Sequence, residues 1–172
     1  APVLAVTGSK GKSSTVSALY YGLQQCGIRA FLGGNITVSP LTFLTETRAD
    51  TPVVLELSSW QLGDLAQRPQ LKPKIALITH IMPDHQNWYG SMERYVADKK
   101  IIYRNQDKTD YTVCNYDDGW GKTFAQETAG QVFWYSAHPL PTHLVGAWIA
   151  PDGSAWMRLK PGDDRLLLPP RI

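Results

Sequence analysis

The segment VTGSKGKSST, residues 6–15, joins a short apolar run directly to a strongly periodic stretch. The run PVLAV predicts a buried strand, and residues 13–26 predict a helix. The helix is predicted because apolar side chains recur there at three-to-four spacing: Val16, Leu19, Tyr20, Leu23 and Cys26. A strand that turns straight into a helix through a glycine-containing loop is the start of an α/β unit.

This loop has the composition of a phosphate cradle. Gly8 and Gly11 let backbone N–H groups turn toward an anion, and a helix N-terminus adds donors and partial positive charge. Lys12 is placed to reach the outer phosphates of a nucleotide. The pattern is a short T-G-x-x-G-K-S form, because Val6 stands where the full Walker pattern has glycine. The alternative for the loop alone is a helix-capping turn that binds nothing.

Further strands and helices alternate along the chain. Strands are predicted at RAFL, TPVVLEL, KPKIALITHI and DYTVCN, and a second helix over residues 91–103. Alternation predicts an α/β fold of the P-loop NTPase-like kind, with a mostly parallel sheet flanked by helices. From about Gly130, QVFWYSAH, HLVGAWIA and SAWMRL predict antiparallel strands in a β-rich C-terminal appendage, with a turn at 151–153. Without repeats or linkers, residues 1–172 are expected to form a single domain.

Composition excludes several classes of partner. The chain has 17 basic and 15 acidic residues. Its net charge of +2 is too small to indicate the basic surface of a nucleic-acid-binding protein. No stretch approaches the roughly 18 apolar residues of a membrane span, so no membrane partner is expected. Cys26 and Cys114 are too few for a disulfide framework and are interpreted as small core side chains, which indicates the reducing cytoplasm.

Polar residues end three of the predicted parallel strands. The first strand leads into the phosphate loop, VVLEL carries Glu56, and IALITHI is followed by Asp84 and His85. Parallel strands present their carboxyl ends to one crevice, so these groups are expected to lie together. A magnesium nucleotide needs hard oxygen ligands, which suits Glu56. The alternatives are a capping role for Glu56 and a structural or solvated His85.

Lys99 lies on the apolar stripe of the second helix, four residues after Tyr95. A buried lysine is unfavourable unless it is paired or neutral. The pattern therefore indicates a functional lysine. The alternative is that its long stem lets the ammonium group reach the solvent at the rim.

Five motifs in order resemble the central domain of the Mur ligases: TGSKGKSS, GGN at 33–35, ELSSWQL at 56–62, PDH at 83–85 and YVADKKIIY at 95–103. They span about the first two-thirds of the chain. GGNI followed by ELSSWQL is most similar to the branch that adds D-glutamate; other Mur ligases and the folylpolyglutamate synthetases differ around the glutamate.

The resemblance implies roles for individual residues. It assigns the ATP phosphates to the loop, with Lys12 on the outer ones: Gly8, Ser9, Lys10, Gly11, Lys12, Ser13 and Ser14. It implies two magnesium ions near Ser13, Glu56, His85 and a carbamylated Lys99, and it makes Lys12, Glu56, His85 and Lys99 the catalytic set. Asn35, Ser58 and Gln61 match positions that contact the muramoyl substrate.

The implied reaction phosphorylates a carboxylate of a UDP-muramoyl substrate with ATP, after which D-glutamate attacks the acyl phosphate. Family members carry a UDP-recognising domain before this one and an amino-acid-binding domain after it; both are expected to be missing from the 172 residues, leaving a monomer that is inactive alone. The alternatives are a nucleotide-dependent binding module, a different P-loop phosphoryl-transfer enzyme, or another ligase of the Mur or folylpolyglutamate type.

Overall fold

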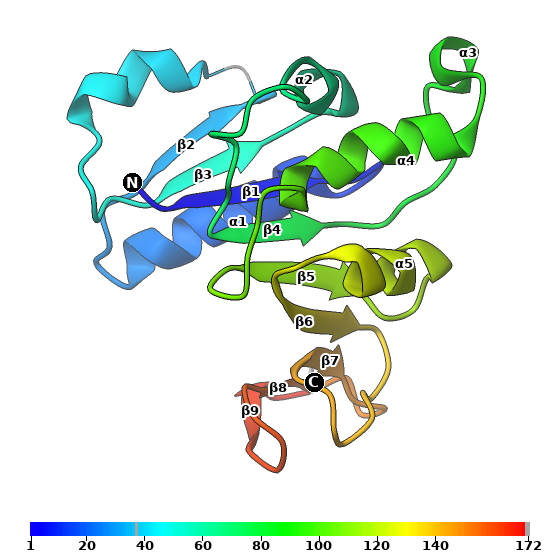
Figure 1. The fold of residues 1–172 in the computed structure, drawn as a ribbon. Coiled ribbons are helices and arrows are strands. Elements are labelled where there is room, and N and C mark those ends of the chain that lie inside the picture. The colour runs from blue at the N-terminus through cyan, green and yellow to red at the C-terminus, as the bar shows by residue number, and fades with distance from the viewer. Residues whose placement is uncertain (37, 171–172) are drawn as a thin grey trace.

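The strands of the chain join into one sheet, which runs through the whole molecule (Figure 1). The computed structural model describes residues 1–36 and 38–170. Its strands are β1 (Val3–Thr7), β2 (Phe31–Gly34), β3 (Val53–Glu56), β4 (Ile75–Ile78), β5 (Tyr111–Asn115), β6 (Gln131–Ser136), β7 (Gly146–Ile149), β8 (Ala155–Arg158) and β9 (Asp164–Leu168). They are ordered β2-β3-β1-β4-β5-β6-β7-β8-β9.

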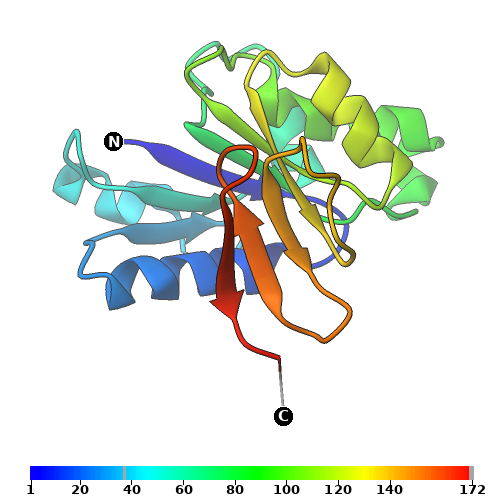
Figure 2. The same ribbon diagram turned by 90° about the horizontal axis from the view of Figure 1, so that it is seen from below.

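Helices cover both faces of this sheet. They are α1 (Lys12–Gln25), α2 (Ser59–Asp64), α3 (Gln86–Tyr89), α4 (Met92–Lys100) and α5 (Gly119–Glu127), with 3-10 turns η1 (Pro40–Glu46) and η2 (Ile101–Tyr103). Figure 2 shows α1 on one side of the sheet and α4 and α5 on the other. The fold class expected from the alternating pattern is therefore the observed one.

The two faces of the sheet bury separate apolar clusters because successive strand residues point to opposite sides. In β1, Ala5 belongs to the larger cluster, which includes residues of α2, α4 and α5. Its neighbour Val6 packs with Val16 of α1 and Val54 of β3 in the smaller one. Both faces being covered explains why the central strands are apolar throughout.

The order of the strands places the loop after β1 at a special point. From β1 the chain moves outward to β2 and returns through β3, then crosses to β4 on the other side of β1. The strand order therefore reverses at β1, and ligands of open α/β sheets bind where this happens. The loops after β1, β3 and β4 all open at that edge.

The C-terminal strands differ from the expectation in their direction. β6 pairs parallel with both of its neighbours, β5 and β7, so the prediction of QVFWYSAH as an antiparallel strand was wrong. β7, in HLVGAWIA, is parallel to β6 and antiparallel to β8. For β6 the reason is α5, which was not predicted from the sequence and returns the chain to the start of the sheet. For β7 it is the segment 137–145, which carries the chain back between the two strands. Among the described strands, antiparallel pairing occurs between β7 and β8 and between β8 and β9, with the predicted turn at 151–153, and these strands extend the main sheet.

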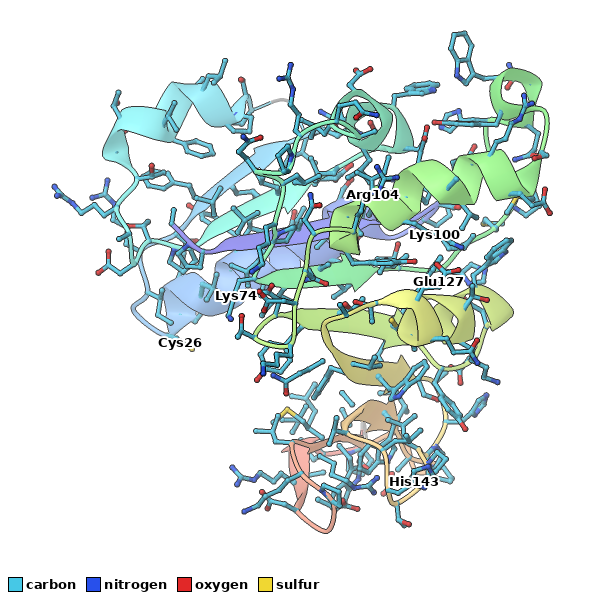
Figure 3. The ribbon with its side chains drawn as sticks, viewed as in Figure 1. Cys26, Lys74, Lys100, Arg104, Glu127 and His143 are labelled. Carbon is cyan, nitrogen blue, oxygen red and sulfur yellow. The ribbon has the colours of Figure 1, made fainter. Side chains whose placement is uncertain are left out.

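The two cysteines have different environments. Cys114 is buried in β5 as predicted, whereas Cys26 is exposed just after α1, so its assignment to the core was wrong (Figure 3). The neighbouring residues 24–29 are exposed as well, so this end of the apolar stripe lies in solvent. Within the residues that the structure describes, no helix has both the length and the hydropathy to cross a membrane.

Candidate active site

The loop after β1 is held tightly against the end of β4. Gly8 has φ +144°, and a Cβ atom there would lie 1.8 Å from Thr79 Oγ1, so only glycine fits. Thr79 Oγ1 lies in hydrogen-bond reach of the carbonyl oxygens of Thr7 and Lys10, at 3.1 and 2.7 Å. Gly11 then begins α1 in the left-handed conformation, with no side-chain cap, so the first N–H groups of α1 remain available to an anion.

Two lysines converge on this loop from different parts of the chain. Lys12 Nζ donates to the carbonyl oxygens of Gly8 at 3.0 Å and Ser9 at 3.3 Å. Lys99 Nζ, from α4, donates to the same Gly8 oxygen at 2.9 Å. The loop thus carries two cationic side chains beside its backbone amides, an arrangement that favours a polyanionic ligand.

Lys99 is 2% exposed, which rules out the alternative of an ammonium group at the solvent rim. Burial, and then the neighbouring charge of Lys12, lower its pKa from 10.5 to about 7; Asp84 and Asp98 oppose the shift. The Nζ atom also lies 4.4 Å from the centre of the Tyr95 ring. A lysine with this pKa is partly a neutral amine at physiological pH.

Glu56 is a buried carboxylate with one oxygen unused. It is 2% exposed at the end of β3, and Oε1 accepts a hydrogen bond from Asn35 Nδ2 at 3.1 Å. Among the described residues, nothing hydrogen-bonds Glu56 Oε2, nor the hydroxyl of Thr7 at the end of neighbouring β1. Buried oxygens without partners are uncommon, so these two atoms are candidates to bind a ligand or a water molecule.

His85 reaches the site from the segment after β4. Its backbone is left-handed (φ 51°), and it is the one non-glycine residue with positive φ in the described ranges 1–36 and 38–170. Strain of this kind collects at functional sites. The exposed His85 ring lies 4.7 Å from Trp60 and 6.3 Å from Tyr95, measured between ring centres.

A cavity of about 210 Å³ collects most of these side chains, and its walls are Lys12, Asn35, Ser58, Ser59, Trp60, His85, Tyr95 and Lys99. Glu56 joins it through the hydrogen bond from Asn35. The structure therefore brings Lys12, Glu56, His85 and Lys99 to one edge of the sheet. Trp60, Ser59 and Tyr95 were not singled out from the sequence, although their motifs were.

Of the remaining candidate residues, Ser58 lines the cavity, whereas the others named here are not among its wall residues. Lys10, Ser13 and Ser14 are exposed at the start of α1. Ser58 and Gln61 form a capping box: Ser58 Oγ accepts from the Gln61 N–H at 3.2 Å, and Gln61 Oε1 accepts from the Ser58 N–H at 2.9 Å. Gln61 therefore has a structural role at the start of α2, while Ser58 also faces the cavity.

A second cavity, of about 440 Å³, adjoins the other side of the loop, lined by Gly11, Thr15, Leu77, Thr79, His80, Asn115 and Tyr135. Tyr135 is anchored by a hydrogen bond to the carbonyl oxygen of Ile78 at 3.2 Å. His80 Nδ1 lies 3.5 Å from Asp118 Oδ2. No role was assigned from the sequence to Thr79, His80, Asn115 or Tyr135, although Asn115 ends a parallel strand and the strand-edge argument could have included it.

The donor set suits a hard cation. Glu56 Oε2 is buried, lacks a hydrogen-bond partner in the described part of the chain and belongs to the ligand class that Mg²⁺ prefers. Within the same described residues, no three His, Cys, Asp or Glu side chains gather into a metal-binding group. A magnesium ion here would therefore need ligands from a nucleotide or water in addition to Glu56, which is usual for Mg²⁺.

The sequence pattern of the Mur ligase middle domain matches residues 6–143, which include the loop, Glu56, His85 and Lys99. The chain belongs to the Mur ligase family. A similar protein, the UDP-N-acetylmuramoylalanine--D-glutamate ligase of Treponema pallidum, is 49% identical over all of this chain and 37% of its own length. The ligase of the same name from Borreliella afzelii is 42% identical over 78% of this chain and 29% of its own length.

Solved structures agree with the fold of this Mur ligase domain. MurF from Thermotoga maritima in complex with ADP has a TM-score of 0.69 at 21% identity, covering 97% of this chain and 40% of its own. FolC from E. coli, solved with DHPP and ADP, has a TM-score of 0.56 at 17% identity, covering 78% of this chain and 42% of its own. The chain spans about a third of the length of the curated relatives it matches.

Proposed function

We propose that this Mur ligase domain binds ATP and supplies the phosphoryl-transfer site of a ligase that joins D-glutamate to UDP-N-acetylmuramoyl-L-alanine. The observation that carries the proposal is that Lys12 and Lys99 both donate to the glycine loop and line one cavity with Asn35, which is hydrogen-bonded to Glu56. The choice of substrates rests on relatives at 49% and 42% identity that share one name.

In the proposed reaction, a substrate carboxylate oxygen attacks the γ-phosphorus of ATP, giving an acyl phosphate and ADP. The amine of D-glutamate then attacks the acyl carbon, forming an amide and releasing phosphate and a proton. The loop amides and Lys12 would hold the phosphates and stabilise charge on the transferred group. When bound near Glu56, Mg²⁺ supplies positive charge that offsets the negative charge of the phosphates.

The two cavities suggest where the two substrates lie. The one of about 210 Å³, beside Asn35, Ser58, Trp60 and His85, suits the acyl substrate. The one of about 440 Å³ adjoins Gly11 and Thr15 and suits the nucleoside part of ATP, with Asn115 and His80 as polar contacts. The loop lies between them, as phosphoryl transfer from ATP to the acyl substrate requires.

Lys99 is proposed to take up carbon dioxide. Its neutral amine would attack the carbon of CO₂ and lose a proton, which leaves a carbamate anion on a long side chain. The pKa of about 7 makes the reactive amine available, and the place beside Glu56 and His85 gives the carbamate a possible role as an additional oxygen ligand. Two magnesium ions, a monomeric state and a cytoplasmic location stay predictions, as do flanking domains for the UDP group and for the amino acid.

The proposal is tested first on nucleotide binding. Calorimetric titration of this chain with magnesium ATP should show one site, and titration with EDTA present should show weaker binding. If the chain binds no nucleotide under either condition, the loop is a capping turn and the proposal fails.

The reaction is tested by grafting. The segment of the Treponema pallidum ligase that matches this chain is replaced by the chain, since the two are 49% identical over its full length. The graft should release phosphate only when both D-glutamate and the UDP-muramoyl substrate are present. Nucleotide binding without such release would favour the alternative of a binding module, and release with a different amino acid would indicate another ligase of the family.

A further inference from the structure

Ser9, in the middle of the phosphate loop, has a hydroxyl group whose full capacity for hydrogen bonds is used. The residue is 4% exposed, and its Oγ donates to the carbonyl oxygen of Met82 at 2.9 Å and accepts from the Met82 N–H at 3.1 Å. A third partner, Tyr95 OH, lies 2.9 Å away. A serine hydroxyl has one proton and two lone pairs. Because the proton goes to Met82, Tyr95 must be the donor in the third bond.

Tyr95 is a buried residue of α4, 1% exposed, and burial raises the pKa of its phenol, so the hydroxyl keeps its proton. Lys99 follows it by one helical turn and donates to Gly8 at 2.9 Å. Residues four apart lie on the same face of a helix. α4 therefore donates hydrogen bonds to two consecutive residues of the loop: Lys99 bonds to Gly8, and Tyr95 bonds to Ser9.

The same serine joins the loop to the segment that follows β4. Besides the two bonds with Met82, the Ser9 N–H donates to the carbonyl oxygen of His80 at 2.9 Å. That segment continues to His85, on the wall of the cavity of about 210 Å³. Ser9 is thus the point where the phosphate loop, α4 and the His85 segment meet.

We propose that Tyr95 is a positioning residue, whose hydroxyl holds Ser9 and thereby keeps the phosphate loop in register with α4 and the His85 segment. This rests on the proposed nucleotide-binding function of the loop. Without the bond, the loop would occupy its binding-competent arrangement for a smaller fraction of the time, and nucleotide affinity falls by that fraction. The tyrosine itself need not touch the nucleotide.

The matched control is Tyr103, which follows α4 in η2. It is also buried, at 5% exposed, and its hydroxyl also donates a single hydrogen bond, to Glu127 Oε2 at 2.9 Å. Glu127 in turn pairs with Lys100, between α4 and α5 (Figure 3). Tyr103→Phe therefore removes a comparable hydroxyl and bond without touching Ser9.

The experiment compares Tyr95→Phe and Tyr103→Phe in this chain, by calorimetric titration with magnesium ADP and by amide hydrogen exchange. Tyr95→Phe should weaken ADP binding about fivefold, the loss expected for one hydrogen bond, and speed exchange in residues 8–12. Tyr103→Phe should leave ADP affinity and the exchange of residues 8–12 unchanged, although its loss of thermal stability should be similar to that of Tyr95→Phe. Wild-type affinity and wild-type exchange of residues 8–12 in folded Tyr95→Phe would overturn the proposal.

Ser9→Ala provides a second route that leaves Tyr95 in place. In the Ser9→Ala background, Tyr95→Phe should have no further effect on ADP affinity, because the hydroxyl has nothing left to hold. An equal fivefold loss in both backgrounds would show that Tyr95 acts otherwise. If the wild-type chain binds no ADP, the proposed function fails, and the exchange of residues 8–12 still decides whether Tyr95 positions the loop.

Discussion

Lys12 and Lys99 donate to the same atom, the carbonyl oxygen of Gly8, at 3.0 and 2.9 Å. Two ammonium groups this close repel each other, and the charge of Lys12 contributes to the low pKa of Lys99 after burial itself. An anion bound at the loop would relieve the repulsion. The pair therefore links the state of Lys99 to whatever occupies the phosphate loop.

Replacing Lys12 should remove most nucleotide binding. Lys12→Ala deletes a positive group that the outer phosphates would contact, and a charge-assisted hydrogen bond of this kind corresponds to about a 10- to 100-fold change in affinity. Calorimetric titration with magnesium ATP measures the effect, with exposed Lys108→Ala as control. Unchanged affinity in a folded Lys12→Ala chain would place the nucleotide elsewhere.

Lys99 should make stability increase with pH above neutrality. Its pKa is about 7 in the folded chain against 10.5 when unfolded, so between these values the unfolded state binds the extra proton. Stability then rises with a slope of up to about 1.4 kcal/mol per pH unit. The difference between wild type and Lys99→Met in urea unfolding at pH 7, 8 and 9 isolates this group. Parallel pH profiles would mean that Lys99 is not titrating in the folded state.

Alanine at Gly8 should destabilise the fold. Alanine would have to adopt a φ of +144°, and its Cβ atom would lie 1.8 Å from Thr79 Oγ1. Together these effects are expected to lower the free energy of unfolding by about 2 kcal/mol or more. Gly22→Ala is the control, since nothing lies within 4 Å of its Cβ position in α1, and it should stabilise by about 0.5–1 kcal/mol. Thermal unfolding of both variants compares them directly, and equal shifts would contradict the tight loop geometry.

Glu56→Gln should weaken the dependence of nucleotide binding on magnesium. The amide keeps the shape and can still accept the hydrogen bond from Asn35, but it removes the anionic oxygen that has no partner in the described residues. ADP titrations with Mg²⁺ and with EDTA should differ strongly in wild type and little in the variant. Glu127→Gln, a surface carboxylate paired with Lys100, should behave as wild type. A full magnesium effect in Glu56→Gln would exclude this carboxylate from the metal site.

Local sequence was sufficient for α1 and for strands of the first half of the fold, whereas α2 was not predicted. The three-to-four spacing after residue 12 and the apolar runs at β1, β3 and β4 predict elements that form largely because of their own patterns. The phosphate loop could also be read locally, since its glycines, Lys12 and the N-terminus of α1 are contiguous in the chain. The sheet edge where Glu56 and His85 arrive followed from the alternation of strands and helices alone.

Tertiary structure decided the features that depend on pairing between distant segments. The direction of β6 depends on α5, a nine-residue helix whose local pattern did not stand out, and the direction of β7 depends on the segment 137–145 that precedes it. The stripe of α4 indicated that Lys99 points inward, but not that its partner is a carbonyl oxygen 91 residues away. The bond from Tyr95 to Ser9 spans 86 residues, and the cavity at Asn115 combines four separate segments. Such contacts depend on which strands pair in the sheet, because strands that are neighbours in the sheet need not be neighbours in the chain.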